Sequence, residues 1–197
     1  MTDMQEPVAE LELPPVEPAP AASVPTSSLP TVVSPAGLPG EVPGPTEFGL
    51  AGITPFVVPS ADFYRIDTAL AVPQVPRADW RLRIHGMVDQ ELELTFDDVL
   101  ARPQVERQVT LSCVSNWVGG PLVGNAVWQG VLLAPLLAEC GVHPDATQVV
   151  SRSVDGWTAG SPTSVITDGR DALLAIGMNG EPLPAAHGYP ARLVVPG

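Results

Sequence analysis

The sequence contains no lysine, and its nine basic residues are all arginines. Against them stand 22 Asp and Glu residues, so the formal net charge of the 197-residue chain is −13 at pH 7. A chain this acidic is repelled by phosphate backbones and by anionic lipid surfaces. We therefore exclude nucleic acids and anionic membranes as partners.

Cysteine is scarce, since Cys113 and Cys140 are the only two, and they do not make a disulfide framework. Cys140 ends an apolar run before Gly141, and we expect it to pack in the core or at a helix end. No Cys-x-x-Cys-His sequence occurs, so an attached c-type haem is excluded. Any electron-transfer partner would then be a separate protein.

Long hydrophobic runs are missing as well. The longest apolar segments, such as Val131–Ala138, are much shorter than the roughly 20 residues that a helix needs to cross a bilayer. The N-terminus has neither the basic region nor the apolar region of a secretory signal peptide. We therefore predict neither a membrane-spanning helix nor a signal peptide in this chain, and the sequence does not indicate its compartment.

The composition divides the chain into two parts. Residues 1–46 hold eleven prolines, no basic residue and no helical or strand period. Such a segment buries too little apolar surface to offset the entropy lost on ordering, so a disordered Pro-rich linker is predicted. A docking tail for a Pro-reading module is the alternative. Residues 47–197 are long enough to form one domain with a sizeable core.

Hydrophobic periodicity predicts more strands than helices in this second part. Helices are predicted at 96–101, after the capping pair Thr95 and Asp98, and from Leu132 to Gly141. Asn-Gly at 179–180 predicts a hairpin turn. Strands are predicted at 80–88, 91–95, 105–113, 148–154, 172–177 and 192–195. Helices inserted among strands indicate an α+β domain with antiparallel or mixed sheets.

One predicted strand runs directly into a polar turn. Apolar and polar residues alternate from Val109 to Cys113, and Ser115, Asn116 and a Gly pair at 119–120 follow. A thiol at the end of a strand, beside a polar turn, lies where a ligand can reach it. Cys113 is therefore either a buried free thiol that acts as a small hydrophobe or a thiolate ligand for a soft metal.

Three blocks of sequence occur in the same order as in one enzyme family. They are Cys-Val-Ser-Asn at 113–116 with Gly-Gly at 119–120, Trp-Gln-Gly-Val-Leu-Leu at 128–133, and His-Gly-Tyr-Pro-Ala-Arg-Leu-Val-Val-Pro-Gly at 187–197. Together with the segment around Phe63 and Tyr64, they make residues 50–197 resemble the molybdopterin-binding domain of the sulfite-oxidase-type oxidoreductases.

The resemblance implies a mixed-sheet α+β fold, a molybdenum–molybdopterin cofactor, a small-molecule substrate and two-electron oxygen-atom transfer. Family members continue beyond the position of Gly197, so we expect the domain to be incomplete at its C-terminal end. Relatives are often exported or attached to membrane helices, which adds a membrane-attached parent protein or subunit to the expected partners.

The resemblance also assigns roles to single residues. Cys113 is implied to be the molybdenum ligand and the catalytic residue, since one soft thiolate completes the sulfur-rich coordination of a pterin dithiolene. Ser115 and Asn116, directly after it, would donate hydrogen bonds to its sulfur and tune the redox potential. Further contacts with the cofactor are implied for Tyr64, Arg65, Ser153, His187 and Arg192.

Structural interpretations stay open for several of these residues. Phe63 and Tyr64 would anchor an extended arm in the core, His187 would be a loop histidine with satisfied hydrogen bonds, and Arg192 would form a surface ion pair. The family often has an Asn before the aromatic pair, where this chain has Ser or Ala.

The residues after Cys113 bear on the substrate. Sulfite oxidases proper have an Arg there for an anionic substrate, whereas this chain has Trp-Val-Gly at 117–119. Sulfite is thus disfavoured, and Trp117 indicates a flatter or less charged substrate such as a sulfoxide. The alternatives to an enzyme are a non-catalytic fragment, a degenerate binding module without a complete cofactor site, or an apo-domain anchored through the Pro-rich tail.

Overall fold

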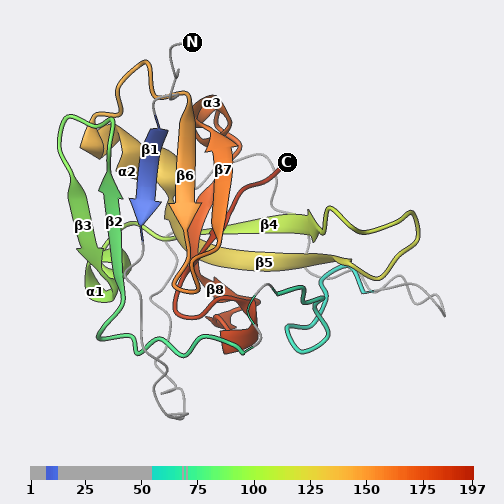
Figure 1. The fold of residues 1–197 in the computed structure, drawn as a ribbon. Helices are drawn as coiled ribbons and strands as arrows, with labels where there is room; N and C mark the ends of the chain where they lie inside the picture. Colours follow the sequence, from blue (N-terminus) through green and yellow to red (C-terminus); the bar gives the residue numbers. More distant parts are fainter. Residues whose placement is uncertain (1–7, 13–54, 68, 70) are drawn as a thin grey trace.

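The computed structural model describes residues 8–12, 55–67, 69 and 71–197. Two five-stranded sheets make up the domain, and in Figure 1 the strands of the first run vertically while β4 and β5 of the second run horizontally. The mixed α+β architecture predicted from the sequence is confirmed. No helix of the described part is long and apolar enough to cross a bilayer.

The first sheet has the strand order β3-β2-β1-β6-β7. Its strands are β1 (Val8–Glu12), β2 (Arg81–His85), β3 (Leu92–Thr95), β6 (Gln148–Arg152) and β7 (Thr158–Pro162). Only the β1–β6 pair is parallel, so the sheet is mixed.

Strand β1 belongs to the segment that the sequence predicts to be a disordered linker. At these five residues the structure differs from that prediction, because the backbone pairs with β2 on one side and with β6 on the other. The rest of the predicted linker lies outside the described residues, so there the linker stays a prediction.

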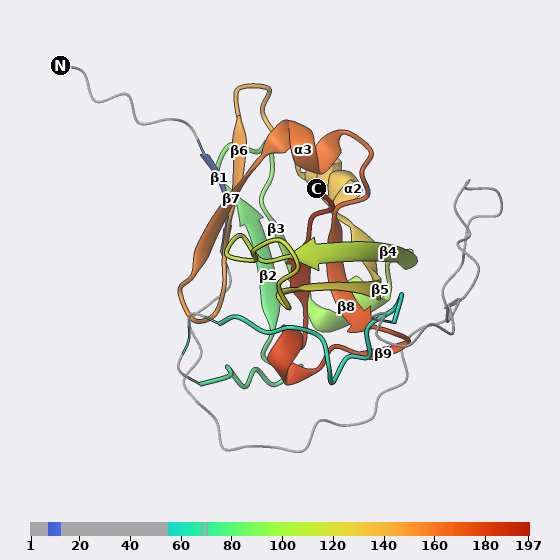
Figure 2. The same ribbon diagram turned by 90° about the vertical axis from the view of Figure 1, so that its right-hand side faces the viewer.

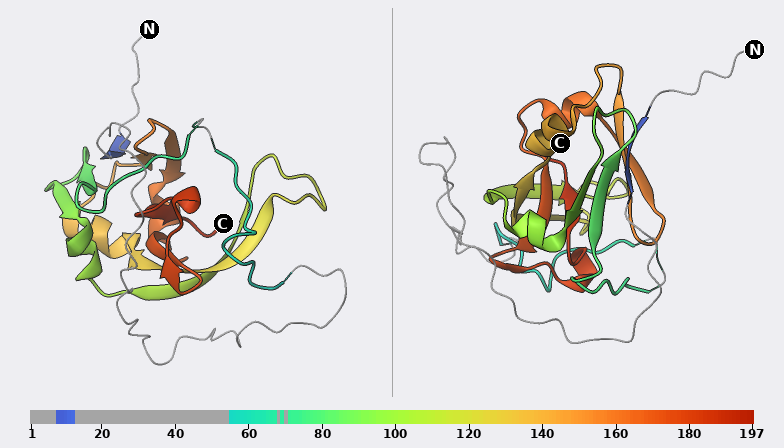
Figure 3. Two further views of the ribbon diagram at one scale, coloured as in Figure 1. Left: turned by 90° about the horizontal axis from the view of Figure 1, so that it is seen from below. Right: turned by 90° about the vertical axis from the view of Figure 1, so that its left-hand side faces the viewer.

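The second sheet is antiparallel and has the order β10-β8-β5-β4, with β9 paired to β8. Its strands are β4 (Val105–Ser112), β5 (Val123–Leu132), β8 (Leu173–Met178), β9 (Glu181–Pro182) and β10 (Arg192–Val194). Seen from below, the β4–β5 hairpin reaches well away from the rest of the domain (Figure 3). The loop that ends it carries Cys113.

Four short helices connect the strands, and α2 and α3 lie side by side at one end of the molecule (Figure 2). They are α1 (Phe96–Leu100), α2 (Leu133–Cys140), α3 (Thr163–Thr167) and the 3₁₀ helix η1 (Ala185–His187). The capping box of Thr95 and Asp98 starts α1, as predicted, and Gly141 ends α2 in the left-handed conformation.

The core has two parts, one on each face of the second sheet. Leu174 and Ile176 of β8 pack with the first sheet and α2, while Leu173, Ala175 and Met178 pack with the other cluster. Because β8 is buried on both faces, its sequence is apolar throughout, as the predicted strand at 172–177 requires. The second cluster is the one that faces Cys113 and its neighbours.

Candidate functional site

The loop after β4 is built from two consecutive turns. The Asn116 N–H donates to the Cys113 carbonyl at 2.9 Å, and the Gly120 N–H donates to the Trp117 carbonyl at 2.8 Å. The Asn116 side-chain oxygen accepts a hydrogen bond from the Leu122 N–H at 3.0 Å. Asn116 therefore shapes the loop and does not hydrogen-bond the sulfur in this structure, unlike the role implied for it by the resemblance.

The Cys113 thiol is partly exposed, and its Sγ lies 3.1 Å from the Ser115 hydroxyl. The Ser115 side chain lowers the pKa of the thiol, and the backbone N–H groups of Ser115 and Val114 lower it further. Hydrogen bonds to the charged form favour that form, so the site stabilises a thiolate. A thiolate is the form that binds a soft metal.

An arm formed by residues 55–64 lies across the end of the second sheet. The Val58 N–H donates to the Asn125 carbonyl at 2.8 Å, and the Asn179 amide donates to the Val58 carbonyl at 3.0 Å and to Ser60 Oγ at 3.1 Å. His187 Nε2 lies 2.8 Å from the Ser60 carbonyl oxygen. Side chains from β5, the β8–β9 turn and η1 thus fix the arm in place.

Phe63 anchors the arm in the core. Its ring stacks on Tyr64 with centroids 5.2 Å apart and meets Trp128 and His187 edge-on at 5.8 and 5.6 Å. Gly124 lies directly against this ring, since a Cβ at that position would lie 2.6 Å from a Phe63 carbon. The anchoring predicted for Phe63 is confirmed, and it leaves Tyr64 half-buried beside it.

Arg192 begins β10 and lies over the Trp128 ring, with its Cζ 5.2 Å from the ring centroid. Its Nη1 donates to the His187 carbonyl at 3.3 Å. Burial lowers the pKa of the guanidinium. No carboxylate among the described residues forms an ion pair with it, so the surface ion pair considered for Arg192 is not formed there.

Tyr64 links the thiol to the guanidinium. Burial raises the pKa of its phenol, the charge of Arg192 lowers this pKa, and the charge of the Cys113 thiolate raises it. Both groups therefore act electrostatically on one phenol. The structure brings Cys113, Tyr64 and the pair His187 and Arg192 from three separate places in the chain to one region, which we call the thiol–guanidinium cluster.

Two predicted site residues are not part of this cluster. Arg65 forms an exposed ion pair with Asp67, two residues further along the arm. Ser153 hydrogen-bonds Asp155 and the Trp157 carbonyl within the turn between β6 and β7. Neither side chain contacts a member of the cluster among the described residues.

Three residues around the cluster were not singled out for this role from the sequence. Trp128 is fully buried, and its indole N–H donates to the Val109 carbonyl at 3.3 Å. Its ring also carries Arg192. Asn125 and Asn179 hydrogen-bond the arm. The sequence feature that could have indicated Asn125 is an Asn within an otherwise apolar strand.

A family model described as an oxidoreductase molybdopterin binding domain matches residues 69–197. The chain belongs to this family. Members of it are molybdenum-cofactor oxidoreductases, so the cofactor implied for this domain is molybdenum–molybdopterin. The predicted sulfite-oxidase-type fold and the predicted cofactor are thereby confirmed at the level of the family.

Individual relatives agree with this placement of the domain. The uncharacterized oxidoreductase YuiH of Bacillus subtilis is 37% identical over 117 residues, covering 59% of this chain and 57% of YuiH. Mitochondrial sulfite oxidase of Drosophila melanogaster is 33% identical over 165 residues, covering 72% of this chain and 28% of that protein.

A solved structure is similar as well. The sulfane dehydrogenase SoxCD from Paracoccus pantotrophus superposes with a TM-score of 0.67 at 28% identity, covering 74% of this chain and 41% of the SoxCD chain. The molybdopterin-binding domain described here therefore spans about half or less of the length of these relatives.

Proposed function

We propose that the thiol–guanidinium cluster holds molybdenum–molybdopterin and that the domain serves two-electron oxygen-atom transfer on a small-molecule substrate. The observation that carries the proposal is the pairing of the Cys113 turn, in which the Ser115 hydroxyl lies 3.1 Å from Sγ, with the Arg192 guanidinium, which has no carboxylate partner among the described residues. Bound there, the cofactor supplies the exchange of an oxygen atom and two electrons.

The donor set fits this cofactor. Among the described residues, no three His, Cys, Asp or Glu side chains are grouped so that they could hold a metal ion. Cys113 offers one soft thiolate, and the dithiolene of the cofactor brings its own sulfur ligands. The Ser115 hydroxyl, 3.1 Å from the sulfur, would remain a hydrogen-bond partner of the ligated thiolate.

Arg192 is the residue suited to the anionic and acceptor-rich part of the cofactor. A guanidinium offers planar, paired donors for phosphate or pterin oxygens, and that of Arg192 lies over the Trp128 ring. Burial of a cation is unfavourable, and no carboxylate among the described residues pairs with Arg192, so an anion that meets it recovers part of the desolvation cost. We assign Arg192 to this contact.

His187 has a different role in the proposal. Its Nε2 is already engaged with the Ser60 carbonyl, and its backbone carbonyl accepts from Arg192. We therefore assign His187 to positioning both the arm and the guanidinium, and Tyr64 to the wall of the cofactor site. Arg65 would join the site only if its ion pair with Asp67 opened.

Turnover needs a source or acceptor of two electrons, and we assign this to a separate electron-transfer partner. The domain in this proposal consists of residues 47–197 together with strand β1, and the rest of the Pro-rich segment serves as a linker. The second candidate is a non-catalytic binding module that holds no cofactor.

Metal and pterin analysis tests the proposal. The full chain is produced in a host that makes the cofactor and, as the matched control, in a host that lacks it. We expect about one molybdenum and one pterin per folded chain from the first host and neither from the second. A folded chain from the first host with neither group would overturn the proposal and favour the non-catalytic module.

A further inference from the structure

Strand β1 lies at the centre of the first sheet, between β2 and β6, although it comes from a distant part of the chain (Figure 1). Residues 13–54 separate it from the arm, and β2 begins only at Arg81. All five residues of β1 pair with β6, and residues 10–12 pair with residues 83–85 of β2. A segment that is far away in the sequence therefore fills the middle of the sheet.

The two neighbours of β1 are also held in place by contacts that do not involve it. Strand β2 pairs with β3, strand β6 pairs with β7, and both Ile84 and Val149 belong to one buried cluster. Three backbone hydrogen bonds join the turn after β2 to the end of α2 and the residues after it. They run from the N–H groups of Asp89, Gln90 and His143 to the carbonyls of Gly141, Cys140 and Met87, at 2.9, 3.1 and 2.9 Å.

Removal of β1 would thus leave a slot with two preformed walls. Neighbouring strands of a sheet lie about 4.8 Å apart, so β2 and β6 would stay roughly 10 Å from each other, which leaves room for one strand. Each wall would present unpaired N–H and C=O groups. Such edges bind a peptide by adding it as a strand, and here the added strand would be paired on both sides.

The slot and the strand have complementary charges. Strands β2 and β6 contain no Asp or Glu, but they contain a histidine and three of the nine arginines of the chain: His85, Arg81, Arg83 and Arg152. The register sets Glu12 opposite both Arg83 and Arg152. It also sets Glu10 opposite His85. Opposite charges at facing positions stabilise the pairing of strands.

The apolar residues of β1 fit the same register. Alternate residues of a strand share one face of the sheet, so Ala9 and Leu11 share the face of the buried residues Val149 and Ile84. A slip by one residue would move both glutamates of β1 to this face. Charge and polarity therefore select the same register.

We propose that the slot between β2 and β6 is a binding site for an extended acidic segment, and that residues 8–12 are its intramolecular ligand, which leaves and returns. A ligand of this class alternates apolar and acidic residues, as Ala-Glu-Leu-Glu does at 9–12. The covalent connection holds residues 8–12 at an effective concentration on the order of 1 mM, so they outcompete a free peptide at micromolar concentration. This inference is independent of the cofactor.

The test cuts this connection in the full chain. A protease recognition sequence is inserted between residues 34 and 35, and a fluorescent dye is attached to the N-terminus. After cleavage, we expect the anisotropy of the dye to fall on dilution, with a midpoint in the micromolar range. An unlabelled peptide of residues 6–14 should displace the labelled fragment. In the uncut chain, neither dilution nor the peptide should change the anisotropy.

Variants of the cut chain test the recognition. Glu10→Lys with Glu12→Lys should weaken binding about tenfold, because both facing charges are then alike. The matched control is Asp3→Lys with Glu6→Lys, which makes the same change of charge outside the paired residues and should weaken binding less than about twofold. Leu11→Pro should abolish retention of the fragment, because a proline in a central strand cannot donate to the ladder.

Hydrogen exchange on the uncut wild-type chain is the second measurement. The amides of residues 8–12 should exchange through a local opening, faster than those of the buried strand β8. If both sets exchange at one rate, removal of β1 unfolds the domain and the inference is wrong. It is also wrong if the cut fragment is lost at every concentration, if it never exchanges with the peptide, or if the Glu10→Lys, Glu12→Lys variant binds like its control.

Discussion

The two cysteines of this protein lie in contrasting regions. Cys113 is partly exposed at the end of the β4–β5 hairpin, and the Ser115 hydroxyl lowers the pKa of its thiol. Cys140 is fully buried at the end of α2, where burial raises the pKa of its thiol. The turn thus favours the thiolate at Cys113, and the core favours the neutral thiol at Cys140.

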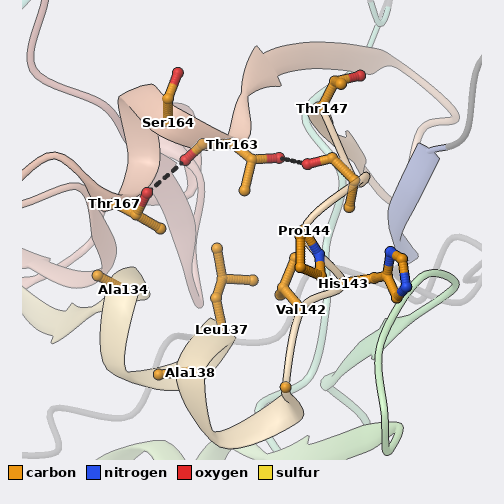
Figure 4. A pocket seen from close by; sticks show the side chains of 12 residues that line it. Ala134, Leu137, Ala138, Val142, His143, Pro144, Thr147, Thr163, Ser164 and Thr167 are labelled. Carbon is orange, nitrogen blue, oxygen red and sulfur yellow. Dashed lines mark hydrogen bonds between the residues drawn. The ribbon is translucent and has the colours of Figure 1, made fainter.

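The region around α2 also contains a hollow of about 810 Å³ between α2, α3 and the segment 141–147 (Figure 4). Two of its four hydroxyl groups are bonded to the backbone, since Thr163 donates to the Ala146 carbonyl at 2.6 Å and Thr167 donates to the Thr163 carbonyl at 3.0 Å. The cluster, in contrast, contains a thiol that is stabilised as a thiolate and a guanidinium that lies over an indole ring. The two regions therefore differ in the side chains that they present, and the volume of a hollow does not mark the candidate site.

Substitutions of the two cysteines should have opposite effects on metal retention and on stability. This is the largest difference that we expect. Cys113→Ser should abolish molybdenum retention and turnover while leaving the free energy of unfolding nearly unchanged, because a hydroxyl is a poor soft-metal ligand. Cys140→Ala should retain metal and activity but lower the free energy of unfolding by about 1–2 kcal/mol. Metal analysis and urea unfolding check both, and an active Cys113→Ser variant would remove Cys113 from the site.

Substitution of Arg192 distinguishes a residue that contacts the cofactor from one that forms only a surface ion pair. Arg192→Ala should weaken pterin retention about 10- to 100-fold, and Arg192→Lys should fall in between because it lacks the planar fork. The control is Arg170→Ala, since Arg170 forms an exposed pair with Asp168. Pterin fluorescence after dialysis measures retention, and equal loss in both alanine variants would contradict the assignment.

The anchoring of the arm can be tested at Gly124. Gly124→Ala should lower the free energy of unfolding by about 1–3 kcal/mol, because the added methyl group overlaps the buried Phe63 ring. Gly160→Ala is the control, since its methyl group would meet only the flexible end of Gln148, 3.0 Å away. Urea unfolding measures both, and a neutral Gly124→Ala variant would show that the arm moves freely.

The smallest effect concerns pH. Alkylation by iodoacetamide follows the thiolate, so in the metal-free chain its rate at Cys113 should rise at a lower pH than for an ordinary thiol. Ser115→Ala removes the main cause of the lowered pKa, and the profile should move to higher pH. Peptide mass analysis at a series of pH values reads both cysteines, and an unmoved profile would exclude Ser115 as the cause.

Local signals predicted most of the fold correctly. The Thr95–Asp98 pair specified α1, and the uninterrupted apolar run specified β8. The longest strand, β5, was missed, because Gly124, Asn125 and Gly130 interrupt its pattern. Tertiary contacts explain why such residues occur in the strand. A Cβ at Gly130, for example, would lie 2.1 Å from the Leu174 carbonyl oxygen across the sheet.

Some residues of the candidate site were likewise predicted from the sequence, and others depend on tertiary contacts. Cys113, His187 and Arg192 were singled out from motifs, whereas the strand and turn pattern alone left Cys113 open between a core thiol and a ligand. The ion pair of Arg65 with Asp67 depends on side-chain orientation. The contact of the Arg192 guanidinium with the Trp128 ring joins residues that are far apart in the chain. Neither contact leaves a local signal in the sequence.

The contact between His187 and Ser60 spans 127 positions of the chain. During synthesis, the ribosome releases the arm, the hairpin and β10 one after another, so the pieces of the cluster meet only when residue 192 has emerged. A cofactor held by both Cys113 and Arg192 would therefore gain its full set of protein contacts only after residue 192 has left the ribosome.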